Sequence, residues 1–242
     1  MIMEGKTEID IIILSYAFND ELKQVTTNCV QSLMLSEDPS SVTFNIIVIE
    51  SYKELGEYQY PHSKTIYPEQ PFGYHRYMNI GIALTNSPYI CLCNNDLIFH
   101  RFWATEMLKS ITAFPELVSL SPVSSILHPV IGIPLHSGIW RGYRIGVELT
   151  GWCLFIKREV FKIIGKLDEN YIFSGADHDY ANLLGVLNLK HALVTSSIVD
   201  HFDSTTLTTQ SKERQEYLNM VTYHYQKWGH RILPVEVRFP EP

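Results

Sequence analysis

The sequence lacks the glycine-rich motifs that mark the two commonest nucleotide-binding α/β folds. The first apolar run is followed by Ser15-Tyr16-Ala17-Phe18, which has none of the glycines of G-x-G-x-x-G. No G-x-x-x-x-G-K-[ST] stretch occurs anywhere. These absences argue against a Rossmann dehydrogenase and against a P-loop NTPase.

Positive charge is also scarce. The 242 residues include 19 Lys and Arg against 26 Asp and Glu, which gives a formal net charge of −7. A protein that coats nucleic acid needs clustered cations to neutralise phosphates, so no nucleic-acid partner is expected. A small phosphorylated ligand needs only a local patch and stays compatible with this balance.

Long hydrophobic runs and paired cysteine motifs are missing as well. No stretch approaches the ~20 apolar residues of a membrane span, and the charged segment Met1 to Asp10 does not read as a signal peptide. We therefore expect a cytoplasmic protein without a transmembrane segment, with room for peripheral contact with a membrane. The 4 cysteines form no C-x-x-C pair. Cys91 and Cys93 should share one face of a strand as buried thiols.

The chain does contain alternating apolar strands and amphipathic helices. Ile9 to Leu14 and Phe44 to Ile49 are typical of buried parallel strands, and the segment between them predicts a helix capped by Asn19-Asp20. Tyr89 to Cys93 predicts a third such strand. A short strand is expected near Thr65. This order predicts a right-handed βαβ unit in one α/β domain with a mostly parallel sheet.

Further elements are expected in the rest of the chain. The patterns predict helices over 72–84, 103–114, 158–164 and 215–228 and from 177 onward, strands over 118–122, 149–157, 193–195 and 198–199, and a loop over 124–147.

Each of three predicted strands ends in polar residues. These endings are Ser15-Tyr16, Glu50-Ser51 and Asn94-Asn95-Asp96. Ligands of parallel α/β sheets bind at the carboxyl edge of the strands, so three such endings on one edge predict a polar crevice.

A family resemblance rests on these endings and on five further motifs. They are the segments Gly73 … Asn79-Ile80-Gly81, Gly151-Trp152 to Phe161 with Gly165-Lys166-Leu167-Asp168-Glu169, Ala176-Asp177-His178-Asp179-Tyr180, His201-Phe202-Asp203-Ser204, and Tyr225-Gln226-Lys227-Trp228-Gly229. In order and spacing the chain resembles the GT-A glycosyltransferases, with family 2 as the closest group. The resemblance implies one domain over residues 1–242. Residues 1–100 would form the nucleotide-sugar-binding half, and 101–242 the acceptor-binding and catalytic half. The fold would be a Rossmann-like, mostly parallel sheet flanked by helices, with a smaller antiparallel part on the acceptor side.

The resemblance implies a divalent metal, Mn²⁺ or Mg²⁺, held by Asp96 and His201. Carboxylate oxygen and neutral imidazole suit such ions. Asn94 stands where the family usually has a first acid, which removes one charge from the site. The alternatives are that Asn94-Asn95-Asp96 is only a turn and that His201 is structural.

Two acids of the motif Ala176-Asp177-His178-Asp179-Tyr180 are the candidate catalytic residues. The resemblance places the general base of an inverting transfer at Asp177, with Asp179 as the less favoured choice. Ala176 replaces the acid that often precedes it. The alternative is that both carboxylates stabilise the start of a helix.

The remaining candidates would bind the nucleotide sugar. The resemblance gives Glu50 a contact with the base or ribose, beside Ser15 and Tyr16, and it adds Asn94 and Asn95 at the third strand end. Arg76 matches a diphosphate, Asn79 would hold the sugar or the Asp96 turn, and Trp152 would form a pocket wall. For Arg76 and Trp152 the alternatives are an exposed helix charge and core packing.

The expected function is transfer of a sugar from a nucleoside-diphosphate sugar to a hydroxyl of a carbohydrate or glycoconjugate acceptor. UDP is the first choice of nucleotide, from its frequency in the family. The weakened acidic motifs at Asn94 and Ala176 keep open a non-catalytic or hydrolytic nucleotide-sugar-binding relative. A sugar-nucleotide pyrophosphorylase ranks lowest, because no Gly-rich basic loop follows Leu14.

Overall fold

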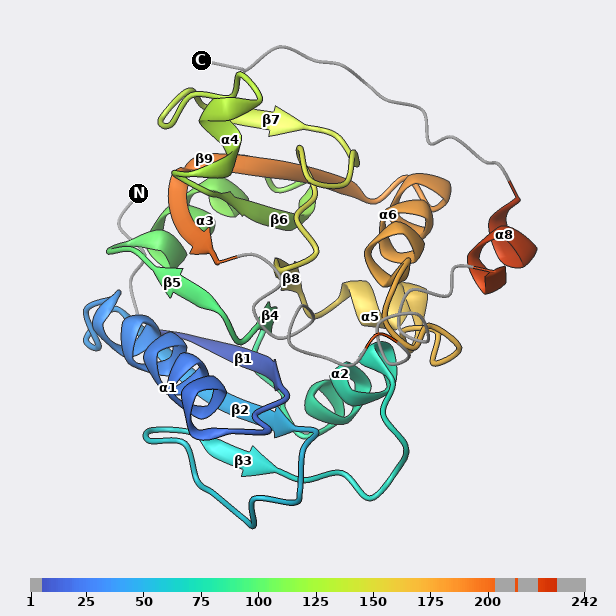
Figure 1. Ribbon diagram of the computed structural model, residues 1–242. Helices are drawn as coiled ribbons and strands as arrows, with labels where there is room; N and C mark the ends of the chain where they lie inside the picture. Colours follow the sequence, from blue (N-terminus) through green and yellow to red (C-terminus); the bar gives the residue numbers. More distant parts are fainter. Residues whose placement is uncertain (1–5, 203–211, 213–221, 230–242) are drawn as a thin grey trace.

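The computed structural model describes residues 6–202, 212 and 222–229. Its described part contains one nine-stranded sheet with the order β3-β2-β1-β4-β8-β6-β9-β5, and β7 pairs with β9 (Figure 1). The Asp203-Ser204 end of one sequence motif and residues 215–221 of the last predicted helix lie outside the described residues.

The first half of the sheet is parallel, as the sequence predicts. β1 (Thr7–Ser15) pairs with β2 (Val42–Glu50) and β4 (Tyr89–Asn94), and β2 pairs with β3 (Lys64–Ile66), all in parallel. These strands carry Ile- and Val-rich runs, which suit a sheet covered on both faces.

The second half contains the antiparallel pairings. β8 (Cys153–Lys157) lies antiparallel between β4 and β6 (Leu117–Val123), and β6 runs parallel to β9 (Lys190–His201). β5 (Leu97–Phe99) and β7 (Ile139–Arg141) each pair antiparallel with β9. Six of the nine strands therefore point in one direction, namely β1, β2, β3, β4, β6 and β9.

Helices cover both faces of the sheet (Figure 1). On one face, Ile9, Ile11 and Ile13 pack in one cluster with α1 (Asp20–Leu35) and α3 (Trp103–Ala113). On the other face, Ile12 packs with α2 (Tyr74–Ala83), α5 (Val160–Ile164) and α6 (Ala176–Val186). The period of two along β1 thus divides its side chains between two cores. Asn19 caps α1 as predicted, because its side chain accepts a hydrogen bond from the Leu22 amide at 2.8 Å.

Two expectations for the second half of the sheet were wrong, and one of its strands was not expected. The predicted loop over 124–147 contains the short helix α4 (Leu127–Val130) and β7. The two short strands over 193–199 are one strand, β9, in which the polar residues Ser196 and Ser197 separate the two apolar runs that the sequence pattern shows. The three-residue strand β5 was not expected. Short strands of this kind give little periodicity from which to predict them.

The last described helix, α8 (Thr222–Trp228), packs beside α6 (Figure 1). Among the described residues, no helix has both the length and the hydropathy needed to span a membrane.

Candidate active site

Three polar strand ends adjoin at the carboxyl edge of the parallel strands. In the pairing register Ser15 of β1 lies opposite Glu50 of β2, and Leu14 of β1 lies opposite Asn94 of β4. The predicted convergence of these endings is therefore present in the fold.

Glu50 is buried, and its carboxylate is occupied by groups of the protein itself. Oε1 accepts hydrogen bonds from the amides of Ala17 (3.1 Å) and Tyr52 (2.9 Å). Oε2 accepts them from the hydroxyls of Ser15 (2.7 Å) and Tyr60 (2.8 Å). Burial and the Glu50 charge raise the pKa of Tyr60, so this phenol stays a donor. Glu50 and Ser15 thus tie the strand ends together, an arrangement that differs from direct contact with a nucleotide.

The neighbouring residues divide between surface and core. Tyr16 is half-buried and forms an edge-to-face contact with Tyr52, at a centroid distance of 5.4 Å, and a tilted contact with Phe18. Asn95 instead turns inward, and its side-chain amide donates to Thr26 of α1 at 2.8 Å. Of these residues, the aromatic group around Tyr16 is the one with exposed surface for a ligand.

Asp96 and His201 come from distant parts of the chain and lie side by side. Because β5 pairs with β9, Leu97 lies opposite His201 and brings Asp96 beside it. Nε2 of His201 lies 3.2 Å from Oδ1 of Asp96, and that oxygen is buried without a hydrogen-bond partner among the described residues. The Asn94 side-chain amide lies 3.4 Å from the same Nε2.

This group fits a divalent cation. A buried carboxylate oxygen without a donor is costly unless a cation or a hydrogen bond compensates it. Neighbouring ligands of an octahedral ion with bonds of about 2.1 Å lie about 3 Å apart, which matches the spacing of Asp96 Oδ1 and His201 Nε2. Oxygen and imidazole ligands suit Mn²⁺ or Mg²⁺. Asp96 and His201 would hold the ion, and Asn94 lies close enough to contribute a neutral contact.

A cavity of about 780 Å³ begins at this group. His201, Asn94 and Trp152 line one side of it, and the start of α6 with Asp177 lines another. The Trp152 ring stacks on His201 with an interplanar angle of 16° and a centroid distance of 5.6 Å. Trp152 also packs against the core, so both interpretations of this residue apply. We call this cavity the central pocket.

The two candidate acids of α6 point in different directions. Residues two apart on a helix do not face each other. Asp177 lines the central pocket, and its side chain is 31% exposed. Asp179 is fully buried, and its Oδ1 receives the Trp228 indole at 2.7 Å and the Lys227 amine at 2.8 Å. Asp179 thus fastens α8 to α6. The helix N-cap is Gly175 and has no side-chain cap bond, so neither acid is an ordinary cap.

Gly151 explains how Asp177 fits against the pocket wall. A Cβ atom at this position would lie 2.7 Å from the Cβ of Asp177 and 3.2 Å from its Oδ2. No side chain fits at that separation without a shift. The glycine that opens the Gly151-Trp152 motif therefore makes room for the candidate base.

Arg76 and Asn79 lie elsewhere, on one face of α2. Arg76 pairs with Glu169 at 3.3 Å and donates to the Pro71 carbonyl. Asn79 is buried, and its amide exchanges hydrogen bonds with the backbone of Leu167 in both directions. Neither residue lines the central pocket. Here they anchor the segment after Gly165, which differs from the phosphate and sugar contacts that the sequence predicts.

The pocket also contains residues that were not among the predicted site residues. Tyr74 of α2, Phe173, and His224 and Tyr225 of α8 line it together with His178 of α6. The motif Tyr225-Gln226-Lys227-Trp228-Gly229 predicted part of this lining. It includes Tyr225, and its Lys227 and Trp228 bind Asp179 and so hold α8 against α6. Nothing in the sequence connects His224 with Tyr171, whose hydroxyl lies 3.1 Å from His224 Nδ1.

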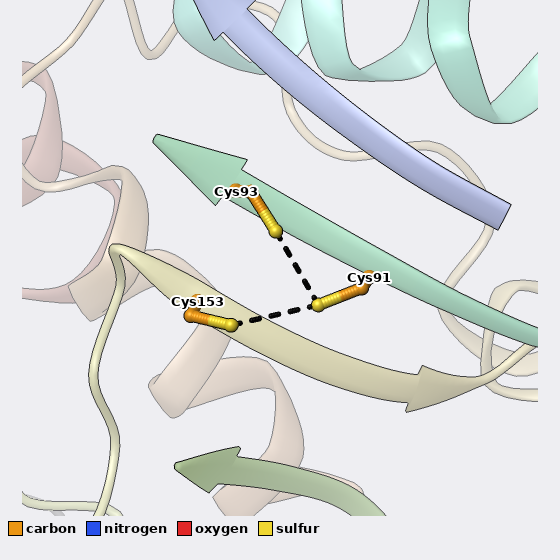
Figure 2. Close-up of side chains that lie close together, drawn as sticks. All are labelled: Cys91, Cys93 and Cys153. Atoms are coloured by element: carbon orange, nitrogen blue, oxygen red, sulfur yellow. Dashed lines mark hydrogen bonds between the residues drawn. The ribbon is translucent and has the colours of Figure 1, made fainter. Parts of the chain in front are cut away.

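A second group of metal-ligating side chains lies in the core, outside the central pocket. Figure 2 shows Cys91 and Cys93 on one face of β4, as predicted, with Cys153 on β8 beside them; the sulfur of Cys91 lies 3.4 Å from that of Cys93 and 3.6 Å from that of Cys153. All three are buried in the apolar cluster, and burial raises the pKa of Cys93 and Cys153. Three thiolates and one divalent ion would leave a net negative charge there, which apolar surroundings disfavour. Burial also acts to raise the pKa of Cys91, but hydrogen bonds with Cys153 and Cys93 outweigh it and lower that pKa. We interpret the group as packed core cysteines.

Neither a protein-family model nor a curated protein matches this sequence. Solved structures do share its fold. "GalNAc-T7 with UDP, GalNAc and Mn2+" matches with a TM-score of 0.59 and 12% identity over 82% of this chain and 44% of that one, so this chain spans less than half its length. TarS 1-349 of S. aureus matches with a TM-score of 0.58 and 10% identity over 91% and 72% of the two chains.

A third structure covers most of the chain. The mannosyltransferase PcManGT from Pyrobaculum calidifontis, in complex with GDP-Man and Mn2+, matches with a TM-score of 0.61 and 10% identity over 96% of this chain and 67% of that one. At identities of 10% to 12%, these matches show a shared fold alone. The chain therefore has the GT-A-type fold that its sequence predicts.

Proposed function

We propose that this chain is a glycosyltransferase that moves a sugar from a nucleoside-diphosphate sugar to a hydroxyl of a carbohydrate-type acceptor, with inversion and with Mn²⁺ or Mg²⁺. One observation carries the proposal. The orphaned Asp96 oxygen faces His201 at 3.2 Å, and His201 lines the same pocket as the carboxylate of Asp177. A metal site and a base on two walls of one cavity are what this reaction needs.

The roles of the residues follow from charge. Breaking the bond between sugar and diphosphate places negative charge on the leaving oxygens, and a bound divalent ion neutralises such charge. Asp96 and His201 hold the ion in this account. Asp177 accepts the proton of the acceptor hydroxyl as that oxygen attacks the sugar.

Inversion is favoured by the composition of the pocket. Asp177 is the one carboxylate among the described residues that line it. Retention through a covalent intermediate needs a nucleophile in addition to an acid/base group. A single carboxylate suits direct displacement, in which it acts as the base.

The donor is assigned to residues 1–100 and the acceptor to 101–242. The aromatic group of Tyr16, Phe18 and Tyr52 offers ring surface for a nucleobase. A UDP-sugar is our first choice of donor. The solved structures with the same fold contain UDP in one case and GDP-Man in another, each with Mn2+. We place the protein in the cytoplasm.

A second candidate is a non-catalytic or hydrolytic nucleotide-sugar-binding protein. Its support is the neutral Asn94 at 3.4 Å from His201, together with Ala176 in place of an acid beside Asp177. Both substitutions lower the negative charge of the site.

The two candidates differ in the fate of the sugar. NMR spectra would follow UDP- and GDP-sugars with Mn²⁺ and a set of glycoside acceptors, with the wild type and Asp177→Asn. The proposal predicts a new glycosidic signal of inverted configuration that appears with the wild type and not with the variant. Free sugar formed equally with and without acceptor supports the hydrolytic candidate, and an unchanged rate in Asp177→Asn overturns the assignment of the base.

A further inference from the structure

The carboxylate of Asp177 is held on one side only. Its Oδ1 accepts two hydrogen bonds from His178, one from the backbone amide at 2.8 Å and one from the ring Nδ1 at 2.9 Å. Its Oδ2 has no hydrogen bond to another described residue and lies against Gly151. The two oxygens therefore have different surroundings: Oδ1 is held by His178, and Oδ2 lies beside the Cβ-free Gly151, with both residues lining the central pocket.

This difference matters for a base that must meet a hydroxyl. A free carboxylate rotates about its terminal bond and spreads its lone pairs over many directions. A carboxylate that is already held in the correct orientation does not pay the entropic cost of becoming oriented in the transition state. The pair of bonds to Oδ1 fixes the plane of the carboxylate, and the missing side chain at Gly151 leaves space at Oδ2.

We propose that His178 is a positioning residue, which holds Oδ1 of Asp177 so that Oδ2 faces the hydroxyl of the acceptor. The inference rests on the proposed role of Asp177 as the base. It goes beyond that role by assigning the histidine between the two acids and by giving the two carboxylate oxygens separate tasks.

The pairing also gives the site a dependence on pH. Nδ1 of His178 donates to Asp177, so titration takes place at Nε2. The hydrogen bond to Asp177 raises the pKa of His178 above its usual value, against the effect of burial. Burial raises the pKa of Asp177, but its bonds and charge interaction with His178 outweigh this and lower it. A protonated His178 thus makes Asp177 a weaker base, and turnover rises as pH passes upward through the His178 pKa.

Other titratable groups face this pair from three elements. On α6, Asp179 points away toward Lys227 and Trp228. On α8, the His224 ring lies edge-to-face at 5.7 Å from His178, and burial and the His178 charge lower its pKa. On α2, burial and the Asp177 charge raise the pKa of Tyr74, so it stays neutral. His178 is therefore the group whose charge changes in direct contact with Asp177.

Two substitutions separate positioning from titration. His178→Asn keeps an N–H donor near the position of Nδ1 but does not titrate, and His178→Ala removes the donor. We expect His178→Ala to lower kcat about 10²-fold. His178→Asn should restore most of the wild-type kcat above neutral pH. Its kcat should not show the fall at acidic pH that protonation of His178 causes in the wild type. His62→Ala, at an exposed histidine that does not line the pocket, is the control. Full kcat in His178→Ala, or a wild-type pH profile in His178→Asn, would overturn the inference.

A readout without turnover distinguishes this inference from the proposed function. NMR titration of the His178 ring should give a lower pKa in Asp177→Asn than in the wild type, because the charged partner is gone. An unchanged pKa overturns the pairing whatever the activity. If the pKa falls but the wild type transfers sugar from no donor, the proposed function fails, and with it the role of His178 in catalysis.

Discussion

Nε2 of His201 lies 3.2 Å from the buried Oδ1 of Asp96, with the Trp152 ring stacked on the imidazole. The pairing of β5 with β9 builds this contact. In the proposed function a metal held by this pair would locate the diphosphate, and the diphosphate would locate the sugar, so the other proposed roles in the pocket depend on where this pair lies.

The first prediction concerns metal affinity. Asp96→Asn and His201→Ala should each weaken Mn²⁺ binding at least about tenfold, because each removes a ligand that the other cannot replace. Electron paramagnetic resonance of free Mn²⁺ measures this without any nucleotide. His62→Ala is the matched histidine control and should bind like the wild type. Wild-type affinity in both ligand variants would remove the metal from this site.

The second prediction separates the two acids of α6. Asp177→Asn should lower kcat by about 10² to 10⁴-fold and leave the melting temperature unchanged, because the side chain lies at the pocket wall. Asp179→Asn should instead cost about 1–3 kcal/mol of stability, because it weakens buried bonds to Trp228 and Lys227. Steady-state kinetics and thermal unfolding of the same two proteins provide the comparison. An exchange of the two phenotypes would reverse our assignment.

The third prediction uses the close approach at Gly151. A methyl group there would overlap Asp177, so Gly151→Ala should displace the base and lower kcat, at a cost of about 1–3 kcal/mol in stability. Gly73→Ala is the control, because its new Cβ would meet ordinary contacts of 3.4 Å or more. Kinetics with the donor at saturation measure the effect. Normal kcat in Gly151→Ala would show that the position of Asp177 is not critical.

The fourth prediction tests whether Arg76 and Asn79 touch the donor. Arg76→Ala should leave nucleotide affinity within about twofold of the wild type, because Arg76 does not line the central pocket. Its partly exposed ion pair with Glu169 should contribute little to the stability of the fold. Asn79→Ala should cost about 1–3 kcal/mol of stability, because it leaves the buried backbone groups of Leu167 without partners. Calorimetry and unfolding curves give the two values. A large loss of nucleotide affinity in Arg76→Ala would restore the phosphate contact expected from the sequence.

The sequence predicted the parallel half of the fold well. Ile-rich strands and the Asn19 cap are local features, and local patterns carry that information. The polar endings at Ser15, Glu50 and Asn94 also predicted the correct edge of the sheet. They did not predict that Glu50 turns inward to four protein donors, because that network depends on tertiary contacts with Ser15 and Ala17 of another strand end and with Tyr60 of the segment after β2.

The candidate acids show the same limit. Their spacing of two on a helix already implies that Asp177 and Asp179 face different sides. Which one faces the pocket depends on α8, whose Lys227 and Trp228 cover Asp179. The sequence did not predict a role for His178 for a related reason. The role proposed for it depends on its hydrogen bonds to Asp177, which no spacing pattern indicates.

Metal-dependent nucleotide binding at Asp96 and His201 is the property on which the proposed function depends. Thermal unfolding would be measured with UDP, GDP, dTDP and CMP, each with and without Mn²⁺, for the wild type and Asp96→Asn. We predict that at least one nucleoside diphosphate, UDP first, raises the melting temperature of the wild type with Mn²⁺ and that the gain is lost in Asp96→Asn. A nucleotide gain of equal size without Mn²⁺, or no gain with any nucleotide, would contradict it.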